Sequence, residues 1–322
     1  MTVSRALTNG GHVSDETRKR VQKAARELGY RPNRLARGLV TRRSKLIGLI
    51  VPDISHSFFA EITRGIQEVI EQHGYNLLLC NANRDAAAEI REVEALLSAH
   101  VDGLLIASEQ PEQSWRYYAG LLAHGVRFAL IDRYFDKLRC ARVGTDDFQA
   151  GKLATEHLIR LGHRDIAHVR GPAIRPARLR WEGYLAALRS HRLKPREDWV
   201  VSGEFRLAES REAARFLMCL RHRPTAIVAG NDTSAFGVIH GCREAGYAVP
   251  GDVSVVGVGN VEGDQHPSPF LTTVHWDRLE MGREAARTLL ASLEDETVKN
   301  AVQEVFAPSL LIRKSTAPPK TS

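Results

Sequence analysis

From Lys45 onward the chain alternates short apolar segments with amphipathic ones, and this alternation constrains the fold more than any other feature. The apolar segments, which have the length and composition of buried strands, are LIGLIV (46–51), YNLLLCN (75–81), VDGLLIAS (101–108), RFALIDR (127–133), DIAHVRG (165–171), TAIVAGN (225–231), VSVVGVGN (253–260) and LTTVHW (271–276). Helical stretches lie between most of them, at 58–73, 87–100, 147–161, 177–191, 209–221, 232–245 and 278–293. Continuously apolar strands between helices indicate parallel sheets covered on both faces. We therefore expect an α/β fold with two doubly wound lobes.

Positive charge is concentrated in the first 45 residues. This segment holds twelve Lys and Arg against three acidic residues, a net charge of +9, whereas the whole chain carries +7 and the remainder therefore −2. A basic segment on a nearly neutral body is typical of a protein that binds a polyanion such as nucleic acid. A solubilising tail is the alternative, but helical patterning and the lack of low-complexity bias favour a binding role.

The basic segment also predicts short helices. The sequence begins within a predicted helix, because apolar residues recur at helical spacing in TVSRAL and NGG then ends the pattern. Ser14 predicts the N-cap of the next helix, which Gly29 ends. A further helix is expected from residue 33 to about 40. Its arginines repel one another, so we expect it to fold only when an anion neutralises them.

Polar and aromatic side chains follow the strands, where ligands bind in doubly wound folds. The strand-end residues are Asp53, His56, Ser57, Phe58, Phe59, Asp132, Arg133, Asp146, Asp147, Asn231, Asp232, Asn260 and Trp276, with Arg175, Arg178, Arg180 and Trp181 near a helix start. Guanidinium groups, carboxylates and aromatic faces together suit a cleft for a small polar ligand. Helix capping or a surface ion pair is the alternative for any single one of these residues.

Other classes of protein find little support in the sequence. GVGNVEG resembles a dinucleotide fingerprint only with the wrong spacing, and prolines follow where a phosphate-binding helix would start. There is no GxSxG, P-loop or HExxH motif, so we expect neither an enzyme nor a cofactor. The four cysteines are scattered without metal-ligand spacing. No apolar run reaches the ~18 residues of a membrane span and no signal peptide is apparent, so we expect a cytoplasmic protein without a membrane partner.

From end to end the chain resembles the LacI/GalR family of bacterial transcription regulators. TVSRAL followed by VSDETRKRVQKAARELGYRPNRLARGL is similar to the family's recognition helix, third helix and hinge helix. IGLIVPDISHSFFAEITRGI, LLSAHVDGLLI, LIDR, AGKLATEHLIRLGHRDIAHVRGP, RPTAIVAGNDTSAFG and PGDVSVVGV are close to its core signatures. The resemblance implies a helix-turn-helix, a hinge helix and a periplasmic-binding-protein-like core of two lobes, in a dimer that binds a pseudo-palindromic operator.

The resemblance also implies which residues contact DNA. They are Thr2, Ser4, Arg5, Asn33, Arg34, Arg37 and Leu39. Arg5 would meet the major groove, where arginine suits guanine, and Leu39 would wedge into a minor-groove step. The alternatives are a solvated Arg5 and a Leu39 that packs between helices.

For the effector, the resemblance adds weight to Asp132, Asp146, Arg180, Asn231 and Asp232. The full set expected to bind it is His56, Phe58, Asp132, Arg133, Asp146, Arg180, Asn231, Asp232, Asn260 and Trp276. The family's aromatic-Asp pair after VSVVG is replaced here by Val258-Gly259, which leaves Asn260 as the nearest polar group. The loss of that carboxylate, together with the basic residues nearby, favours an anionic effector such as a sugar phosphate or sugar acid over an ordinary sugar.

These features predict a ligand-responsive DNA-binding regulator, with repression as the expected outcome. The expected parts are a partial helix-turn-helix (1–30), a hinge helix and linker (31–45), an N-terminal lobe (46–158 with 275–300), a C-terminal lobe (159–274 with 301–315) and a disordered tail (316–322). The family's first helix and following turn are not found before Met1, so we expect Met1 to be an internal methionine and DNA binding by this chain to be weak. A sugar-binding protein without effective DNA binding is the alternative.

Overall fold

The computed structural model describes residues 13–30, 43–261, 269–294 and 303–320, and the chain divides into two units, residues 1–45 and 46–322. In the first unit, α2 (Asp15–Glu27) begins where the sequence predicts, since the Ser14 hydroxyl accepts a hydrogen bond from the Thr17 amide. Gly29 follows the helix with a φ of +61°. Leu28 is 82% exposed, so the apolar stripe of α2 ends on an open face within the described part of the unit. The expected hinge helix and the seven residues expected to contact DNA lie outside the described residues.

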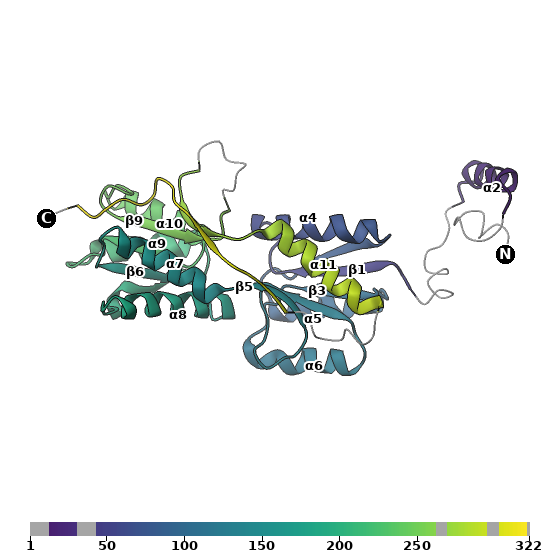
Figure 1. The fold of residues 1–322 in the computed structure, drawn as a ribbon, viewed down its shortest axis with the longest axis horizontal. Helices are drawn as coiled ribbons and strands as arrows, with labels where there is room; N and C mark the ends of the chain where they lie inside the picture. Colours follow the sequence, from purple (N-terminus) through teal and green to yellow (C-terminus); the bar gives the residue numbers. More distant parts are fainter. Residues whose placement is uncertain (1–12, 31–42, 262–268, 295–302, 321–322) are drawn as a thin grey trace. The chain divides into compact units, whose positions relative to one another are not determined.

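The second unit begins with a lobe built on six parallel strands. The strand order is β2 (Asn76–Asn81), β1 (Leu46–Val51), β3 (Gly103–Ile106), β4 (Phe128–Ile131), β5 (Ala141–Thr145) and β11 (Gln303–Phe306). Its helices are α4 (Ser57–Gln72), α5 (Ala86–Ser98), α6 (Trp115–Ala123) and α11 (Arg278–Glu294), with a 3₁₀ turn at Glu112–Ser114. α4 and α11 pack together over one face and α5 and α6 lie on the other (Figure 1). We call this the first lobe.

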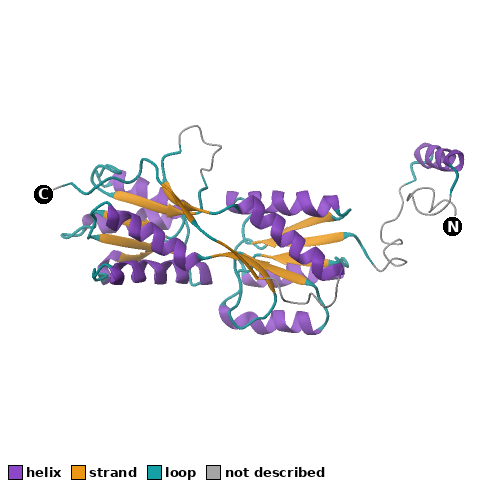
Figure 2. Cartoon of the chain, in the orientation of Figure 1, coloured by secondary structure: helices purple, strands orange, loops and turns teal. Residues whose placement is uncertain are grey.

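The second lobe repeats the same order. Its strands run β7 (Val200–Ser202), β6 (Ile166–Arg170), β8 (Ala226–Ala229), β9 (Ser254–Val258), β10 (Thr272–His275) and β12 (Ser309–Leu311), and only the β10–β12 pair is antiparallel in the described chain. Its helices are α7 (Asp147–Arg160), α8 (Arg175–Ser190), α9 (Leu207–Cys219) and α10 (Asp232–Glu244), with a 3₁₀ turn at Glu197–Trp199. Helices and strands alternate along the chain as the hydrophobic pattern predicts, and Figure 2 shows the strands of each lobe flanked by helices. The expected fold of two parallel-sheet lobes is confirmed.

Glycines let the helices of each pair approach closely. A Cβ added to Gly65 of α4 would lie 2.1 Å from the carbonyl oxygen of Leu279 in α11. In the second lobe, a Cβ on Gly151 of α7 would lie 2.0 Å from the carbonyl oxygen of Arg180 in α8. Since real Cβ atoms do not come this close to backbone, glycine fixes the spacing of these helices, and the second contact also fixes the backbone at Arg180.

The chain crosses between the lobes three times, from β5 into α7, from β10 into α11, and from β11 into β12. The last crossing is the yellow ribbon that runs between the two lobes in Figure 1. These crossings differ from the expected lobe boundaries. α7 packs on α8 in the second lobe, not the first, and β11 joins the first-lobe sheet, not the second. The expected boundaries followed the apolar pattern, which does not show which sheet a strand joins.

Further differences concern short or polar elements. The structure adds β5, β7, β11, β12 and α6 to the predicted elements. The β11 strand is mostly exposed, so it lacks the apolar run by which strands were recognised. Residues 316–320 are not a disordered tail. The Ala317 amide donates to the Ser254 hydroxyl over 3.0 Å, and Lys320 pairs with Asp252 over 2.6 Å.

Candidate functional site

A pocket lies between the two lobes, where the carboxyl ends of both sets of parallel strands meet. It is lined by Pro52, Asp53, His56, Phe58, Phe59, Arg84, Glu109, Asp132, Arg133, Ile174, Pro176, Arg180, Phe205, Asn231, Asp232, Val258, Gly259, Val261 and Trp276. In each lobe the strand order reverses between two neighbouring strands, β1 and β3 in the first lobe and β6 and β8 in the second. Doubly wound folds bind ligands at this reversal point, and lining residues follow all four of these strands. We call this cavity the main pocket.

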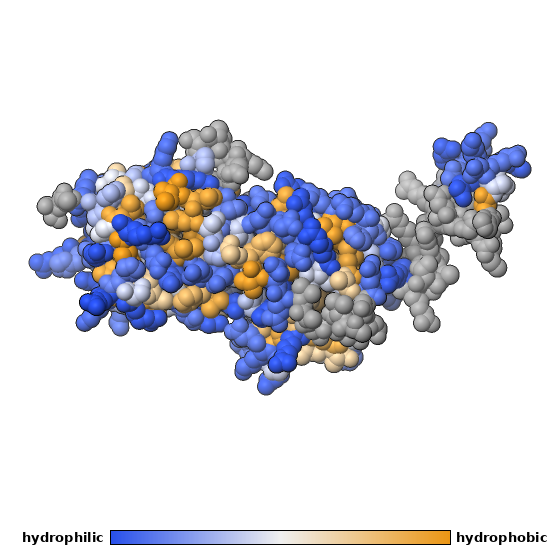
Figure 3. Space-filling model, in the orientation of Figure 1, coloured by the Kyte–Doolittle hydropathy of each residue, from blue (hydrophilic) through white to orange (hydrophobic). Residues whose placement is uncertain are grey.

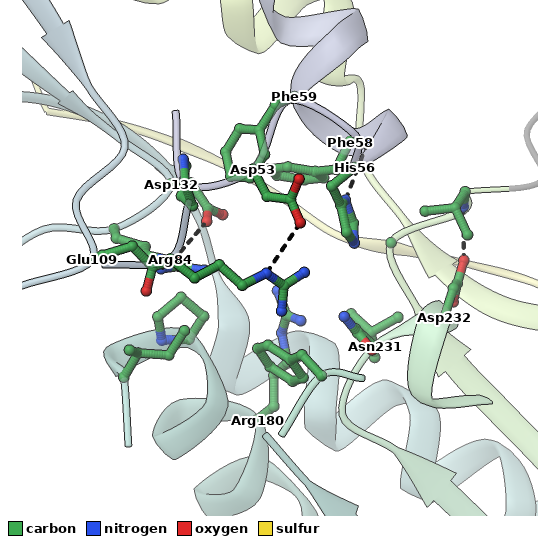
Figure 4. A pocket seen from close by; sticks show the side chains of 18 of the residues that line it. Asp53, His56, Phe58, Phe59, Arg84, Glu109, Asp132, Arg180, Asn231 and Asp232 are labelled. Atoms are coloured by element: carbon green, nitrogen blue, oxygen red, sulfur yellow. Dashed lines mark hydrogen bonds and ion pairs between the residues drawn. The ribbon is translucent and has the colours of Figure 1, made fainter. Parts of the chain in front are cut away.

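The first lobe contributes an aromatic wall and an ion pair. His56 caps α4 through its ring nitrogen, and the rings of Phe58 and Phe59 meet edge to face with centroids 4.9 Å apart. Arg84 donates to Asp53 over 3.2 Å, and Figure 4 shows this pair pointing into the pocket. The His56 Nε2 atom lies 3.3 Å from the Thr233 hydroxyl of the second lobe, so the two walls also touch directly.

The second lobe contributes Arg180, which α8 aims into the pocket from the opposite side (Figure 4). Its Nε and Nη2 atoms both lie 2.8 Å from Asp147 Oδ1, and its Nη1 donates to the Gly230 carbonyl over 2.9 Å. The guanidinium carbon lies 5.7 Å from the ring centroids of both Phe205 and Trp276. Arg180 is therefore held rigidly by backbone, carboxylate and aromatic faces, which suits a positioning role toward a ligand.

Arg133 lies between two acidic residues at the ends of β3 and β4. Its Nη1 is 2.5 Å from Glu109 and its Nε is 3.7 Å from Asp132. The three arginines of the main pocket, Arg84, Arg133 and Arg180, each have a carboxylate partner. Asp53, Glu109, Asp132 and Asp232 also line the main pocket, so it carries no excess of positive charge.

Asn231 and Asp232 begin α10 and hold the second wall in place. The Asn231 side chain accepts from the Ser234 amide, and the Asp232 carboxylate accepts from the Thr273 hydroxyl over 2.6 Å and the Val261 amide over 2.8 Å. Asp232 is 1% exposed, so its side chain mainly orders the surrounding strand ends. Asn231 is 9% exposed and remains the more accessible of the pair.

Burial shifts the pKa of several pocket groups. It raises the pKa of Asp232 to about 6, and burial together with the nearby Asp147 raises the pKa of Asp132 to about 6. Burial and the Arg84 guanidinium lower the pKa of His56 to about 4, so this imidazole is neutral at pH 7. Burial alone would raise the pKa of Asp53, but hydrogen bonds from Ser55 and Arg84 outweigh it and leave that pKa lowered.

Eight of the ten residues expected to bind the effector line the main pocket. They are His56, Phe58, Asp132, Arg133, Arg180, Asn231, Asp232 and Trp276. The other two are placed elsewhere. Asp146 accepts from the Gln149 amide as the N-cap of α7, and Asn260 accepts from Arg313 over 2.7 Å and lies 3.3 Å from His275. Both side chains are therefore engaged in local structure, and neither lines the main pocket.

Sequence reasoning missed several lining residues. Arg84 follows β2 and Glu109 follows β3, so the strand-end rule applied to every predicted strand would have found both. Phe205 follows β7, a strand of three residues that the apolar pattern did not reveal. Ile174 and Pro176 flank the start of α8 and carry no chemical signal.

The described residues hold no group of three or more His, Cys, Asp or Glu side chains that could bind a metal ion. The helices of the described chain include none that is long and apolar enough to cross a membrane. The pocket offers cationic donors, anionic acceptors and aromatic faces, and both lobes contribute to it. That chemistry suits reversible binding of a small polar molecule.

Comparison with known families gives two matches that together span most of the chain. Residues 44–308 match the model for periplasmic binding proteins and the sugar-binding domain of the LacI family. Residues 1–33 match the model for bacterial regulatory proteins of the lacI family.

Individual relatives and structures agree with these matches. The HTH-type transcriptional repressor PurR of Actinobacillus pleuropneumoniae serotype 3 (strain JL03) is 32% identical over 317 residues, which cover 98% of this chain and 94% of that protein. Catabolite control protein A of Priestia megaterium is 32% identical over 306 residues, covering 94% and 92%. Among solved structures, the Lac repressor dimer bound to operator and the anti-inducer ONPF has a TM-score of 0.85 at 28% identity, covering 98% of this chain and 94% of that one. The transcriptional regulator CelR–cellobiose complex has a TM-score of 0.77 at 30% identity, covering 98% and 95%.

Proposed function

Because the chain belongs to the LacI family of bacterial regulatory proteins, we propose that it is a transcriptional repressor whose operator affinity changes when a small effector binds between its lobes. It acts as a binding protein in the cytoplasm, not as an enzyme. The names of two relatives support this proposal, since PurR is a transcriptional repressor and the other is catabolite control protein A.

The observation that carries this proposal is the main pocket, because both lobes line it. An effector that contacts Arg84 from the first lobe and Arg180 from the second binds best when the lobes are close together. Binding therefore favours one arrangement of the lobes over another, and the three crossing segments absorb the change. In a dimer, this change alters the distance between the two DNA-binding segments.

DNA binding rests on the first 45 residues, whose net charge is +9. Lysine and arginine neutralise phosphates, which gives affinity that falls steeply with salt, and base contacts add specificity. The residues assigned to these contacts are Thr2, Ser4, Arg5, Asn33, Arg34, Arg37 and Leu39.

A homodimer on a palindromic operator fits this proposal. Large hydrophobic side chains are exposed on both lobes of the described chain, including Ile54 (55%), Phe216 (52%) and Ile312 (67%). Figure 3 shows hydrophobic patches between hydrophilic residues on the surface of both lobes. Exposed hydrophobic patches favour association with another protein surface, here a second copy.

The effector proposed for the main pocket is sugar-like. Phe58, Phe205 and Trp276 provide aromatic faces for the apolar face of a sugar ring, and paired carboxylates and guanidinium groups provide acceptors and donors for hydroxyls. The buried indole N–H of Trp276 has no hydrogen-bond partner in the described chain and can donate to a ligand hydroxyl. The anionic effector expected from the sequence remains part of the proposal. Since the lining of the main pocket carries no excess positive charge, a negative group needs a neighbouring site.

Selection of DNA from a random duplex library by the purified chain tests the DNA-binding part. A gel-shift titration then compares the selected duplex with a scrambled one at several salt concentrations. We expect a palindromic consensus and tighter binding to it than to the scrambled duplex. Equal, purely salt-dependent binding to both, or no binding, would contradict the repressor function and favour a sugar-binding protein.

A further inference from the structure

A second cavity, of about 270 Å³, adjoins the main pocket between the two lobes. Both lobes line it. The first lobe contributes Ser108, Gln110, Glu112 and residues 133–135, and the second lobe contributes Arg170, residues 172–175 and Arg178. Arg133 and Ile174 line both cavities, so one ligand can extend from the main pocket into this one. We call it the arginine cavity.

The arginine cavity differs from the main pocket in charge. Its lining includes Arg133, Arg170, Arg175 and Arg178 but only one acidic residue, Glu112. Three of these arginines have carboxylate partners outside the lining, Arg133 with Glu109 and Arg175 and Arg178 with Asp136, whereas Arg170 has none in the described chain. Arginine is also the side chain best shaped to bind the oxygens of a phosphate or carboxylate.

Arg175 is held in position and still has a free donor. Its Nε donates to Asp136 over 3.0 Å, and its guanidinium carbon lies 3.8 Å from the ring centroid of Tyr134. Its Nη1 atom is buried and lacks a hydrogen-bond partner among the described residues. A buried, unpaired guanidinium N–H is costly, and a ligand oxygen in the cavity would satisfy it.

The two other second-lobe arginines are more exposed. Arg178 Nη2 donates to Asp136 over 3.2 Å and its Nη1 donates to Glu182 over 2.9 Å, so one carboxylate of the first lobe orients both Arg175 and Arg178. Arg170 lies over the ring of Trp181, 5.4 Å from its centroid, and has no acidic partner in the described chain. The N-terminus of α8 adds partial positive charge near the cavity, because Ile174 has no side-chain group that could cap the helix.

From this arrangement we propose that the arginine cavity binds the anionic group of the effector, a phosphate or a carboxylate, while the uncharged part occupies the main pocket. The inference rests on the proposed effector role of the main pocket. It assigns the negative charge of the effector to Arg170, Arg175 and Arg178 rather than to Arg180, and it explains how a main pocket with balanced charge serves an anionic ligand. Because Ser108, Gln110 and Arg133 of the first lobe line the same cavity as these second-lobe arginines, the anion also favours close approach of the lobes.

Inorganic phosphate tests the cavity without sugar or DNA. The melting temperature of the full chain is measured against sodium phosphate, with sodium chloride at matched ionic strength as the reference. We expect saturable stabilisation by phosphate. In the Arg175→Gln/Arg178→Gln variant, loss of two charge-assisted contacts should weaken phosphate binding about tenfold or more.

Two further variants separate this effect from general changes of charge or folding. Arg215→Gln removes an exposed arginine of α9 that pairs with Glu212 and lines neither cavity, so its phosphate affinity should equal that of the wild type. Arg170→Ala removes an exposed side chain without an acidic partner, so it should fold normally and still bind phosphate more weakly. Circular dichroism checks that each variant is folded.

A second arm, by calorimetry, compares glucose with glucose 6-phosphate and gluconate, so that the source of the anion is identified. Tighter binding of an anionic sugar, reduced to the affinity of the neutral sugar in Arg175→Gln/Arg178→Gln, supports the proposal. Phosphate stabilisation that does not saturate, or that persists unchanged in both cavity variants, overturns it. Failure of the gel-shift experiment with intact phosphate binding would refute the proposed DNA-binding function and leave the anion site standing.

Discussion

Replacing Arg180 by methionine removes the guanidinium group but keeps a long side chain. Arg180 is 6% exposed and Asp147 is 1% exposed, so the substitution leaves a buried carboxylate without its cation. Breaking a buried ion pair from one side costs about 3–5 kcal/mol, and we expect the free energy of unfolding at pH 7 to fall by that amount. Urea denaturation followed by circular dichroism measures it.

The pH dependence of this loss has a definite sign. Burial raises the pKa of Asp147, and Arg180 opposes that rise. Without Arg180 the folded-state pKa rises further above the unfolded value, so the folded variant takes up a proton more readily than its unfolded chain. The deficit relative to the wild type should therefore be largest at pH 7 and should shrink as the pH falls toward 5.

A double-mutant cycle with Asp147→Asn isolates the ion pair. The Gly230 carbonyl loses its Arg180 donor in both the single and the double variant, so that loss cancels in the cycle. We expect a coupling energy of about 1–3 kcal/mol, with Arg180→Met/Asp147→Asn less destabilised than the sum of the single variants. Additive effects, or an Arg180→Met protein as stable as the wild type at both pH values, would refute the ion-pair reasoning.

Two other predictions concern the same structural features. Burial raises the pKa of Asp132 to about 6, so the folded protein gains stability as the pH falls from about 6 toward 4. Asp132→Asn should reduce that gain by roughly 1–3 kcal/mol, as measured by calorimetric melts. An unchanged dependence of stability on pH would argue against a protonated Asp132. Gly65→Ala places a Cβ 2.1 Å from the Leu279 carbonyl oxygen and should lower the free energy of unfolding by about 2–4 kcal/mol. Gly120→Ala in α6 has open space around its Cβ and should raise the free energy of unfolding by up to about 1 kcal/mol. Equal effects of the two substitutions would contradict the close packing of α4 and α11.

The sequence predicts the fold where burial is continuous. Strands such as Leu46–Val51 are apolar along their whole length and were found within a residue or two of their observed bounds. Elements without a continuous apolar sequence were missed, as for β11, whose first three residues are exposed, and for β5 (ARVGT), which is largely buried but contains Arg142. Which sheet a late strand joins depends on tertiary pairing across more than a hundred residues, as in the pairing of Gln303 with Arg142. The hydrophobic periodicity of the sequence does not indicate such a pairing.

The main pocket was largely predictable because strand ends gather in this fold. Eight of ten residues expected at the site line it, yet their pairing could not be predicted. Arg133, expected from the sequence to bind the effector, pairs with Glu109, and Arg180 pairs with Asp147. Buried guanidinium donors without a hydrogen-bond partner among the described residues include Nε of Arg133 and Nη1 of Arg175, which the sequence placed only near a helix start. Whether an arginine is neutralised depends on side chains brought together by folding, and residue type alone does not determine it.

The central claim is that ligand binding between the lobes changes affinity for DNA, and a gel-shift titration of the selected operator with and without effector tests it most directly. The effector is the tightest binder from the sugar and sugar-phosphate panel, added at a saturating concentration. We expect the operator dissociation constant of the wild type to change about fivefold or more, and that of Arg180→Met to stay constant. An effector that binds by calorimetry and leaves the wild-type operator affinity unchanged would contradict the claim.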